Sequence, residues 1–348
     1  MPLVKISEES IRRVAEIISG GGLAAFPTET VYGLGGDAYN PAALAKIFEA
    51  KGRPRFDPLI VHIAAVEALE CVADTGLLDG AARKNLAALA GRFWPGPLTL
   101  VLPKRDAVPG LATSGLPTVA VRIPAHDAAR RLIMLSTGAV AAPSANPFGY
   151  LSPTRAEHVL EMLGDKAGLI LDGGPTTVGL ESTVLDISGG QSRILRPGGT
   201  PKEAIEAVIG PVAVGLVAGE SAESVPASEN GMASPGMLKS HYAPRVPLSV
   251  YGNDSPGAMP NQPGAALLFF DGASRDAWLA GQRPPVNAAA IEVLSETGDT
   301  IEAAARLFET LHRLDSSGVE RIHTQLAGDK GLGAAINDRL KRAAVYPQ

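Results

Sequence analysis

The chain has 348 residues, of which 45% are hydrophobic and 19% are charged, a balance typical of globular proteins long enough for two domains. Its formal net charge of -5 argues against a broad phosphate-binding surface, so we expect weak or no direct nucleic-acid binding. A single cysteine, Cys71, excludes an intramolecular disulfide and favours a reducing compartment. The N-terminus lacks a signal-peptide pattern and no stretch has the length of a membrane span, so we expect a cytoplasmic protein without membrane contact.

Apolar periodicity and turn residues predict an α/β domain in residues 1–210. In chain order, the expected helices span 7–19, 40–50, 65–73, 80–93, 127–135, 154–163 and 200–209, and a capping box at Thr200 opens the last one. The expected strands span 23–26, 59–63, 97–103, 118–124, 139–142, 168–172, 181–187 and 192–198. Residues 33–36, GLGG, are expected to form a bend where backbone can approach a ligand. Because strands and helices do not alternate strictly, we expect a twisted, mixed sheet.

Residues 211–244 differ in composition from the segments on either side. Positions 217–239 are mostly Ala, Gly, Ser, Glu and Pro, which is typical of a linker. The end of this segment, SPGMLKSHYAP at 234–244, is rich in residues that fix backbone shape, so we expect an ordered lid there. Residues 245–348 return to strands and helices in alternation and predict a smaller, parallel, Rossmann-like α/β domain.

Cations and small polar residues gather where predicted strands begin or end. Lys51 and Arg53 stand between a helix and a strand, and such a pair suits a multiply charged anion. Ser144, Asn146 and Arg196 supply further donors of the kind that a triphosphate requires. The chain contains no GxxxxGK[ST], HExxH or CxxC motif, so a nucleotide would have to bind by another route.

Two runs resemble a known family. PTETVYGLG at 27–35, and KGRP with PLIVHI between positions 51 and 63, resemble the YrdC-like threonylcarbamoyl-AMP synthases, in the form with a C-terminal Rossmann-like domain. The resemblance implies a nucleotidyltransferase that makes threonylcarbamoyl-AMP and pyrophosphate from L-threonine, bicarbonate and ATP, for threonylcarbamoyl modification of tRNA adenosine. It also implies Mg²⁺ held mainly by the ATP phosphates, with no metal site built by the protein, and a downstream threonylcarbamoyl transferase as partner.

The resemblance also implies roles for individual residues. Lys51 and Arg53 match the catalytic cations. The matched ATP-binding positions are Lys51, Arg53, Asp57, Thr118, Ser144, Asn146, Ser152, Arg196 and Tyr242. The matched L-threonine-binding positions are Thr30, His62, Arg122, Ala142 and Ser182, with Arg122 expected to clamp the carboxylate. Asp57 stands where the family often has asparagine, which puts an added negative charge in the nucleotide site, and no residue stands out as a general base.

Each of these residues also has a simpler structural explanation. Lys51 and Arg53 suit a solvated pair at a helix end, His62 a core histidine, Arg122 a structural ion pair, and Tyr242 a packing anchor for the linker. Ser144 and Asn146 are common turn residues, Ser182 suits the start of a strand, and Arg196 a surface position.

Two other functions stay open at this stage. One is a carbamoyl-adenylate-forming carbamoyltransferase like those of hydrogenase maturation, although the acylphosphatase-like and zinc-finger modules of those proteins are missing here. The other is an RNA-binding module, because YrdC-like domains offer a concave basic surface; the acidic net charge and the few aromatic residues disfavour it.

Overall fold

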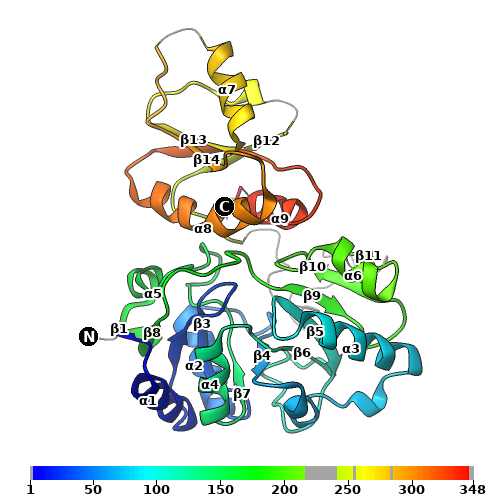
Figure 1. The fold of residues 1–348 in the computed structure, drawn as a ribbon. Helices are drawn as coiled ribbons and strands as arrows, with labels where there is room; N and C mark the ends of the chain where they lie inside the picture. The colour runs from blue at the N-terminus through cyan, green and yellow to red at the C-terminus, as the bar shows by residue number, and fades with distance from the viewer. Residues whose placement is uncertain (1–2, 216–240, 254–255, 283–284, 345–348) are drawn as a thin grey trace. The chain divides into compact units, whose positions relative to one another are not determined.

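The computed structural model describes residues 3–215, 241–253, 256–282 and 285–344, which fall into two compact units (Figure 1). Unit 1 holds Met1–Phe148, Pro153–Thr176 and Glu181–Met237, and unit 2 holds Gly149–Ser152, Thr177–Leu180 and Leu238–Gln348. The boundaries predicted at 210 and 244 flank a stretch outside the described residues and stay predictions. The predicted lid lies outside the described residues too, except for positions 241–244.

Unit 1 is built on one large sheet. Its strands are β1 (Leu3–Lys5), β2 (Ala24–Phe26), β3 (Gly33–Asp37), β4 (Ile60–Ile63), β5 (Leu98–Pro103), β6 (Thr118–Arg122), β7 (Ala139–Ala141), β8 (Leu169–Asp172), β9 (Thr183–Asp186), β10 (Arg193–Arg196) and β11 (Ala213–Val214). They form an 11-stranded sheet in the order β1-β8-β2-β3-β7-β4-β6-β5-β9-β10-β11. The sheet is mixed, because β4 pairs with β6 in parallel and with β7 antiparallel, which confirms the predicted fold class.

The helices of unit 1 begin and end largely where the sequence predicts. They are α1 (Glu8–Ser19), α2 (Pro41–Lys51), α3 (Gly80–Phe93), α4 (Asp127–Leu135), α5 (Ala156–Leu163) and α6 (Lys202–Ile209). The Asn40 side chain caps α2 by accepting from Ala42 N, and Gly52 ends it in the left-handed conformation, with φ of 62°. Lys51 is therefore the last helical residue and not the first of a loop.

Two local predictions in unit 1 are wrong. Residues 65–73 form only a short 3₁₀ helix, Val66–Cys71. The capping box at Thr200 is absent, because α6 starts after Pro201 with no side-chain cap. Thr200 instead pairs with Thr183, whose Oγ1 donates to Thr200 O at 2.6 Å and accepts from Thr200 N at 3.0 Å.

The GLGG run is also different from its prediction. It is not a bend but most of strand β3, which pairs antiparallel with β2. A Cβ atom on Gly35 would lie 2.6 Å from Phe26 Cε1 and 3.0 Å from Val140 Cγ1. The glycine therefore makes room for the buried Phe26 ring.

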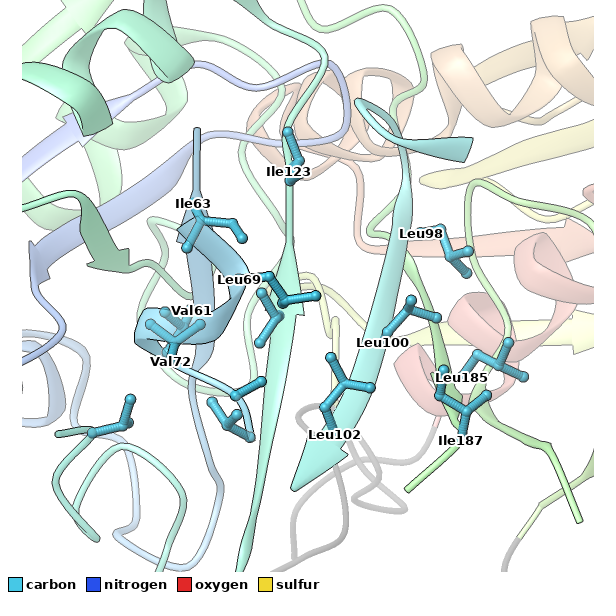
Figure 2. Packing of buried hydrophobic residues seen from close by; sticks show 14 of the residues in the cluster. Val61, Ile63, Leu69, Val72, Leu98, Leu100, Leu102, Ile123, Leu185 and Ile187 are labelled. Carbon is cyan, nitrogen blue, oxygen red and sulfur yellow. The ribbon is translucent and has the colours of Figure 1, made fainter. Parts of the chain in front are cut away.

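The main core of unit 1 covers one face of strands β4, β5, β6 and β9 (Figure 2). Alternate residues of four adjacent strands point into it, including Val61 and Ile63 of β4, Leu98, Leu100 and Leu102 of β5, Val121 of β6, and Leu185 of β9. Because successive strand residues point to opposite faces, His62, Thr99 and Arg122 belong to the other face. This alternation places a polar set on the face away from the main core.

Unit 2 contains a smaller, all-parallel sheet. Its strands are β12 (Leu248–Tyr251), β13 (Ala265–Asp271), β14 (Ala290–Ser295) and β15 (Arg321–Gln325), in the order β12-β15-β13-β14. Its helices are α7 (Gly272–Gly281), α8 (Thr300–Ser316) and α9 (Gly333–Ala343). The parallel α/β prediction is confirmed. Among the described residues, no helix is long and apolar enough to cross a membrane.

Replacing Gly35 by alanine should test the packing role of β3. The added methyl group must displace the Phe26 ring, so we expect the free energy of unfolding to fall by about 1–3 kcal/mol, the usual cost of overpacking a core. Gly91→Ala is the matched control, because Gly91 is exposed within α3 with nothing near its Cβ position, and alanine there should stabilise slightly. Urea unfolding of both variants measures the difference, and equal stabilities would contradict this role.

Candidate active site

The polar face of unit 1 centres on Arg122, at the end of β6. Its side chain is buried, and its guanidinium contacts two other parts of the chain, at Gly96 and at the neighbouring residues Glu29 and Thr30. Nε donates to Gly96 O at 3.1 Å, Nη1 donates to Thr30 Oγ1 at 2.9 Å, and Nη2 forms an ion pair with Glu29 Oε1 at 2.7 Å. The predicted threonine-binding residues Thr30 and Arg122 are therefore in direct contact.

Glu29 and Thr30 are themselves fixed by the turn that follows β2. The second carboxylate oxygen of Glu29 accepts from Ala125 N at 3.0 Å. The Thr30 hydroxyl lies 2.8 Å from Thr28 Oγ1, and the Thr28 hydroxyl donates to Val31 O at 2.6 Å. The run PTET thus folds into a compact, buried turn that presents one carboxylate and one hydroxyl to Arg122.

Ser182 joins the same face from the segment before β9. Its hydroxyl lies 2.7 Å from Thr99 Oγ1, and Thr99 directly precedes Leu100, which pairs with Val121 in the β5–β6 register. Arg196 Nη2 donates to Ser182 O at 2.9 Å and reaches Ser182 Oγ at 3.3 Å. A Cβ atom on Gly198 would lie 2.5 Å from Ser182 O, so the turn after Arg196 rests on the backbone at Ser182. Arg196 is buried and not at the surface.

His62 stands beside Arg122 on the neighbouring strand, with the two residues paired in the β4–β6 register. It is buried, and burial first, then the positive charge of Arg122, lower the pKa of His62 from its ordinary value near 6.5 to about 3. The imidazole is therefore neutral at physiological pH. A neutral ring can take part in hydrogen bonding as donor and acceptor without adding charge beside the guanidinium.

Lys51 forms a second centre of positive charge. Its ammonium donates to Ser144 O and to Asn146 O, both at 2.5 Å, so the predicted Ser144 and Asn146 positions do lie at this lysine, through their backbone carbonyls. Lys51 is only 3% exposed, and burial, followed by repulsion from Arg53, lowers its pKa well below the usual range. Asp57 and Glu181 oppose this shift, and Glu181 is the neighbour of Ser182 in the sequence.

Arg53 is held by the loop between α2 and β4. Its Nε donates to Asp57 O at 3.0 Å, and its Nη2 donates to Pro58 O at 2.8 Å and lies 2.9 Å from Asp57 Oδ2. Both side chains of the ion pair are buried. The added negative charge of Asp57 is therefore balanced inside the protein by Arg53.

Four other predicted residues have different surroundings. Thr118 starts β6, at the opposite end of the strand from Arg122, and Ala142 donates its N–H to Ile60 O at 3.0 Å. Ser152 and Tyr242 belong to unit 2, where Ser152 O lies 3.0 Å from His312 Nε2. The Tyr242 ring lies 5.8 Å from the Phe308 ring and 4.9 Å from Arg339 Cζ. Binding roles for these residues stay predictions.

Glu29, Thr99 and Glu181 were missed by the sequence analysis. Thr99 had a visible signal, since it interrupts an apolar strand as His62 and Arg122 do. Glu29 lay inside the quoted PTET run, but its partner is 93 positions away, and sequence spacing gives no hint of that pairing.

Known protein families match the two parts of this chain. The family described as "Telomere recombination" matches residues 16–198, and the family described as "Threonylcarbamoyl-AMP synthase, C-terminal domain" matches residues 200–345. The chain is 43% identical over 353 residues to the threonylcarbamoyl-AMP synthase of Pyrococcus abyssi, covering 98% of this chain and 96% of that protein. The chain belongs to the threonylcarbamoyl-AMP synthase family.

Further relatives agree with this membership. The threonylcarbamoyl-AMP synthase of Bacillus subtilis is 40% identical over 342 residues, covering 97% of this chain and 94% of that protein. The crystal structure of P. abyssi Sua5 complexed with L-threonine matches with a TM-score of 0.81 and 40% identity, covering 98% of this chain and 96% of that one. The resemblance seen in the motifs is confirmed, and with it the prediction that this member of the threonylcarbamoyl-AMP synthase family is an enzyme.

The depressed pKa of His62 predicts a pH dependence of stability. Between pH 6.5 and about 3 the unfolded state binds a proton at this residue that the folded state does not, so the free energy of unfolding should fall as pH falls through that window. His62→Gln should reduce this slope by up to one proton, about 1.4 kcal/mol per pH unit. Urea unfolding at several values between pH 7 and 4 measures both slopes. Identical slopes in wild type and variant would show that His62 titrates normally.

Proposed function

We propose that the polar face around Arg122 and Lys51 is the site at which this enzyme joins L-threonine, bicarbonate and ATP into threonylcarbamoyl-AMP. Relatives that match almost the whole chain are named for that activity, and one solved structure is of P. abyssi Sua5 in complex with L-threonine. Within the chain itself, the observation that supports the proposal best is the placing of two buried cations, Arg122 and Lys51, among hydroxyls and backbone carbonyls in one unit.

Arg122 suits the carboxylate of the amino acid. A guanidinium has five N–H donors. Nε and one N–H of Nη1 donate to Gly96 O and Thr30 Oγ1, and Nη2 faces Glu29 in an ion pair. One N–H then remains on each terminal nitrogen, which is the arrangement that a carboxylate uses in a bidentate pair. The hydroxyls of Thr30 and Ser182 and the neutral ring of His62 are the polar groups available for the rest of a threonine molecule.

The reaction needs positioning more than proton transfer by the protein. The neutral threonine amine attacks the carbon of bicarbonate, giving a carbamate and water. A carbamate oxygen then attacks the α-phosphorus of ATP, the bond from the α-phosphorus to the bridging oxygen breaks, and pyrophosphate leaves. Negative charge builds on phosphate oxygens during the second step, so fixed cations close to them lower its barrier.

Lys51 is suited to that role. Its ammonium has three N–H donors, and two are taken by Ser144 O and Asn146 O. The third is available to a phosphate oxygen, whose negative charge would offset the burial that now lowers the lysine pKa. Arg53, held by Asp57, supplies a second cation.

Magnesium fits this site as an ion carried by the nucleotide. Its main ligands would be phosphate oxygens, because Mg²⁺ prefers oxygen ligands and is usually bound together with substrate phosphates. When bound, Mg²⁺ neutralises phosphate charge.

We also propose a cytoplasmic location and a downstream threonylcarbamoyl transferase that accepts the product. The two functions left open by the sequence have no specific observation in their favour.

Replacing Lys51 by methionine should separate catalysis from folding. The variant keeps the length of the side chain but loses the charge, so we expect kcat/KM for ATP to fall by about 100-fold or more. The control is Lys46→Met, because Lys46 lies on the same helix and also donates to a carbonyl, Gly21 O, but is exposed. Pyrophosphate release with all three substrates, and mass spectrometry of the product, measure the effect.

Circular dichroism should show both lysine variants folded. Near-normal turnover by Lys51→Met would remove this lysine from the site. Pyrophosphate release by the wild type that does not require threonine would contradict the proposed function as a whole.

Replacing Glu29 by glutamine should reveal the role of Arg122. Loss of the carboxylate leaves a buried guanidinium without its counter-charge, so the free energy of unfolding should fall by up to about 3–5 kcal/mol. L-Threonine should then raise the melting temperature of Glu29→Gln by more than it raises that of the wild type, because the ligand carboxylate supplies the missing charge. Glu9→Gln, at an exposed position of α1, is the control. Equal shifts in all three proteins would mean that Arg122 does not hold the threonine carboxylate.

A further inference from the structure

Helix α8 of unit 2 contacts two short segments that interrupt the sequence of unit 1. These segments, Gly149–Ser152 and Thr177–Leu180, belong to unit 2 by their contacts. The first begins three positions after Asn146, whose carbonyl holds Lys51, and the second ends two positions before Ser182. Each segment therefore adjoins a residue that the proposed function places in the substrate site.

The second segment touches α8 through Gly179. Its φ is +73°, and a Cβ atom on it would lie 2.5 Å from Ala304 O and 2.6 Å from Ala305 Cα. The backbone of the segment therefore rests directly on the backbone of the helix. This approach is possible because the segment has a glycine and the helix has alanines at the point of contact.

The first segment is held by a hydrogen bond from a side chain. His312 Nε2 lies 3.0 Å from Ser152 O, and a carbonyl can only accept, so Nε2 carries the proton. Burial is the main cause that lowers the pKa of His312, which keeps the ring neutral and this tautomer available. At the other end of the segment, Ala243 N donates to Gly149 O at 2.8 Å.

We propose that α8 is a positioning element for the substrate site, and that Gly179 and His312 are its positioning residues. Gly179 fixes the point from which the chain enters Ser182 and its bonds with Thr99 and Arg196. His312 fixes the far end of the loop whose carbonyls, Ser144 O and Asn146 O, hold Lys51. The proposal rests on the proposed function and gives unit 2 a part in the reaction that works through chain connectivity.

The two residues should affect different substrates. Because Gly179 leads into Ser182, Gly179→Ala should raise KM for L-threonine by about tenfold or more, since small misplacements of binding groups are costly, and should change KM for ATP less. The matched control is Gly190→Ala, at a glycine with φ of +64° and nothing near its Cβ position, which has the same backbone strain without the clash. Its KM values should stay close to those of the wild type.

A pair of variants at His312 tests the other contact and does not depend on whether Gly179→Ala folds. His312→Leu removes the donor to Ser152 O and should raise KM for ATP several-fold, whereas His312→Gln keeps an N–H group at a similar distance and should restore it. If His312 served folding alone, His312→Leu would lower the melting temperature but would not raise KM for ATP selectively, and His312→Gln would have no KM to restore. A glutamine variant as impaired as the leucine variant would overturn the role of the hydrogen bond.

Hydrogen exchange gives a readout that does not require turnover. Amide exchange should rise at 181–184 in Gly179→Ala and at 144–152 in His312→Leu, and stay unchanged at both places in Gly190→Ala. Folded variants with wild-type KM values and wild-type exchange would overturn the proposal. If the wild type makes no threonylcarbamoyl-AMP but the variants show these exchange changes, the proposed function is overturned and the positioning by α8 is still supported.

Discussion

The buried guanidinium of Arg122 is the interaction on which the polar face of unit 1 depends. Removing such a charge from water costs several kcal/mol unless acceptors surround it, and Arg122 obtains them from Gly96, Thr30 and Glu29. These residues come from the approach to β5 and from the turn after β2. The charge therefore holds β6, the approach to β5 and the turn after β2 in contact. The main hydrophobic core would not orient these three segments by itself, because it contacts the opposite face of the strands.

Lys51 and Arg53 are both buried, yet the protein neutralises them differently. Arg53 forms a buried ion pair with a carboxylate, that of Asp57. Lys51 contacts carbonyl dipoles, and its pKa is lowered because these do not offset burial and the neighbouring positive charge. The first arrangement fixes a side chain, whereas the second leaves a deficit of negative charge that a polyphosphate can fill. A lysine held by carbonyl groups and an arginine held by a carboxylate thus stand two positions apart.

Local rules predicted the parts of the structure that depend on near neighbours. The cap at Asn40 and the alternating strands appear as expected because both depend on residues a few positions apart. The prediction of a bend at the GLGG run was wrong because glycine occurs both in bends and at close contacts inside a strand. Here the close contacts are with the ring of Phe26 and with Val140, which is distant in the sequence. The capping box failed because Thr183, 17 positions away, takes the backbone groups of Thr200. The motifs included most of the polar residues that lie together in the structure. The ion pair between Glu29 and Arg122, in contrast, could be recognised only from the folded structure.

Tyr242 shows how a residue can satisfy a family motif and a packing requirement together. Its φ of +66° is unfavourable for a bulky side chain, and strain of this kind persists only where the surroundings determine the conformation. The surroundings here are Arg339, which lies over the ring at cation–π distance, and Phe308 of α8. His241 N donates to Arg342 O and Ala243 N donates to Gly149 O, so the backbone is fixed on both sides of the strained residue. The end of the predicted lid is thus held in one shape by unit 2. Since α8 also contacts Gly179 and Ser152, the same helix fixes three separate segments, and a change in α8 would act on all three at once.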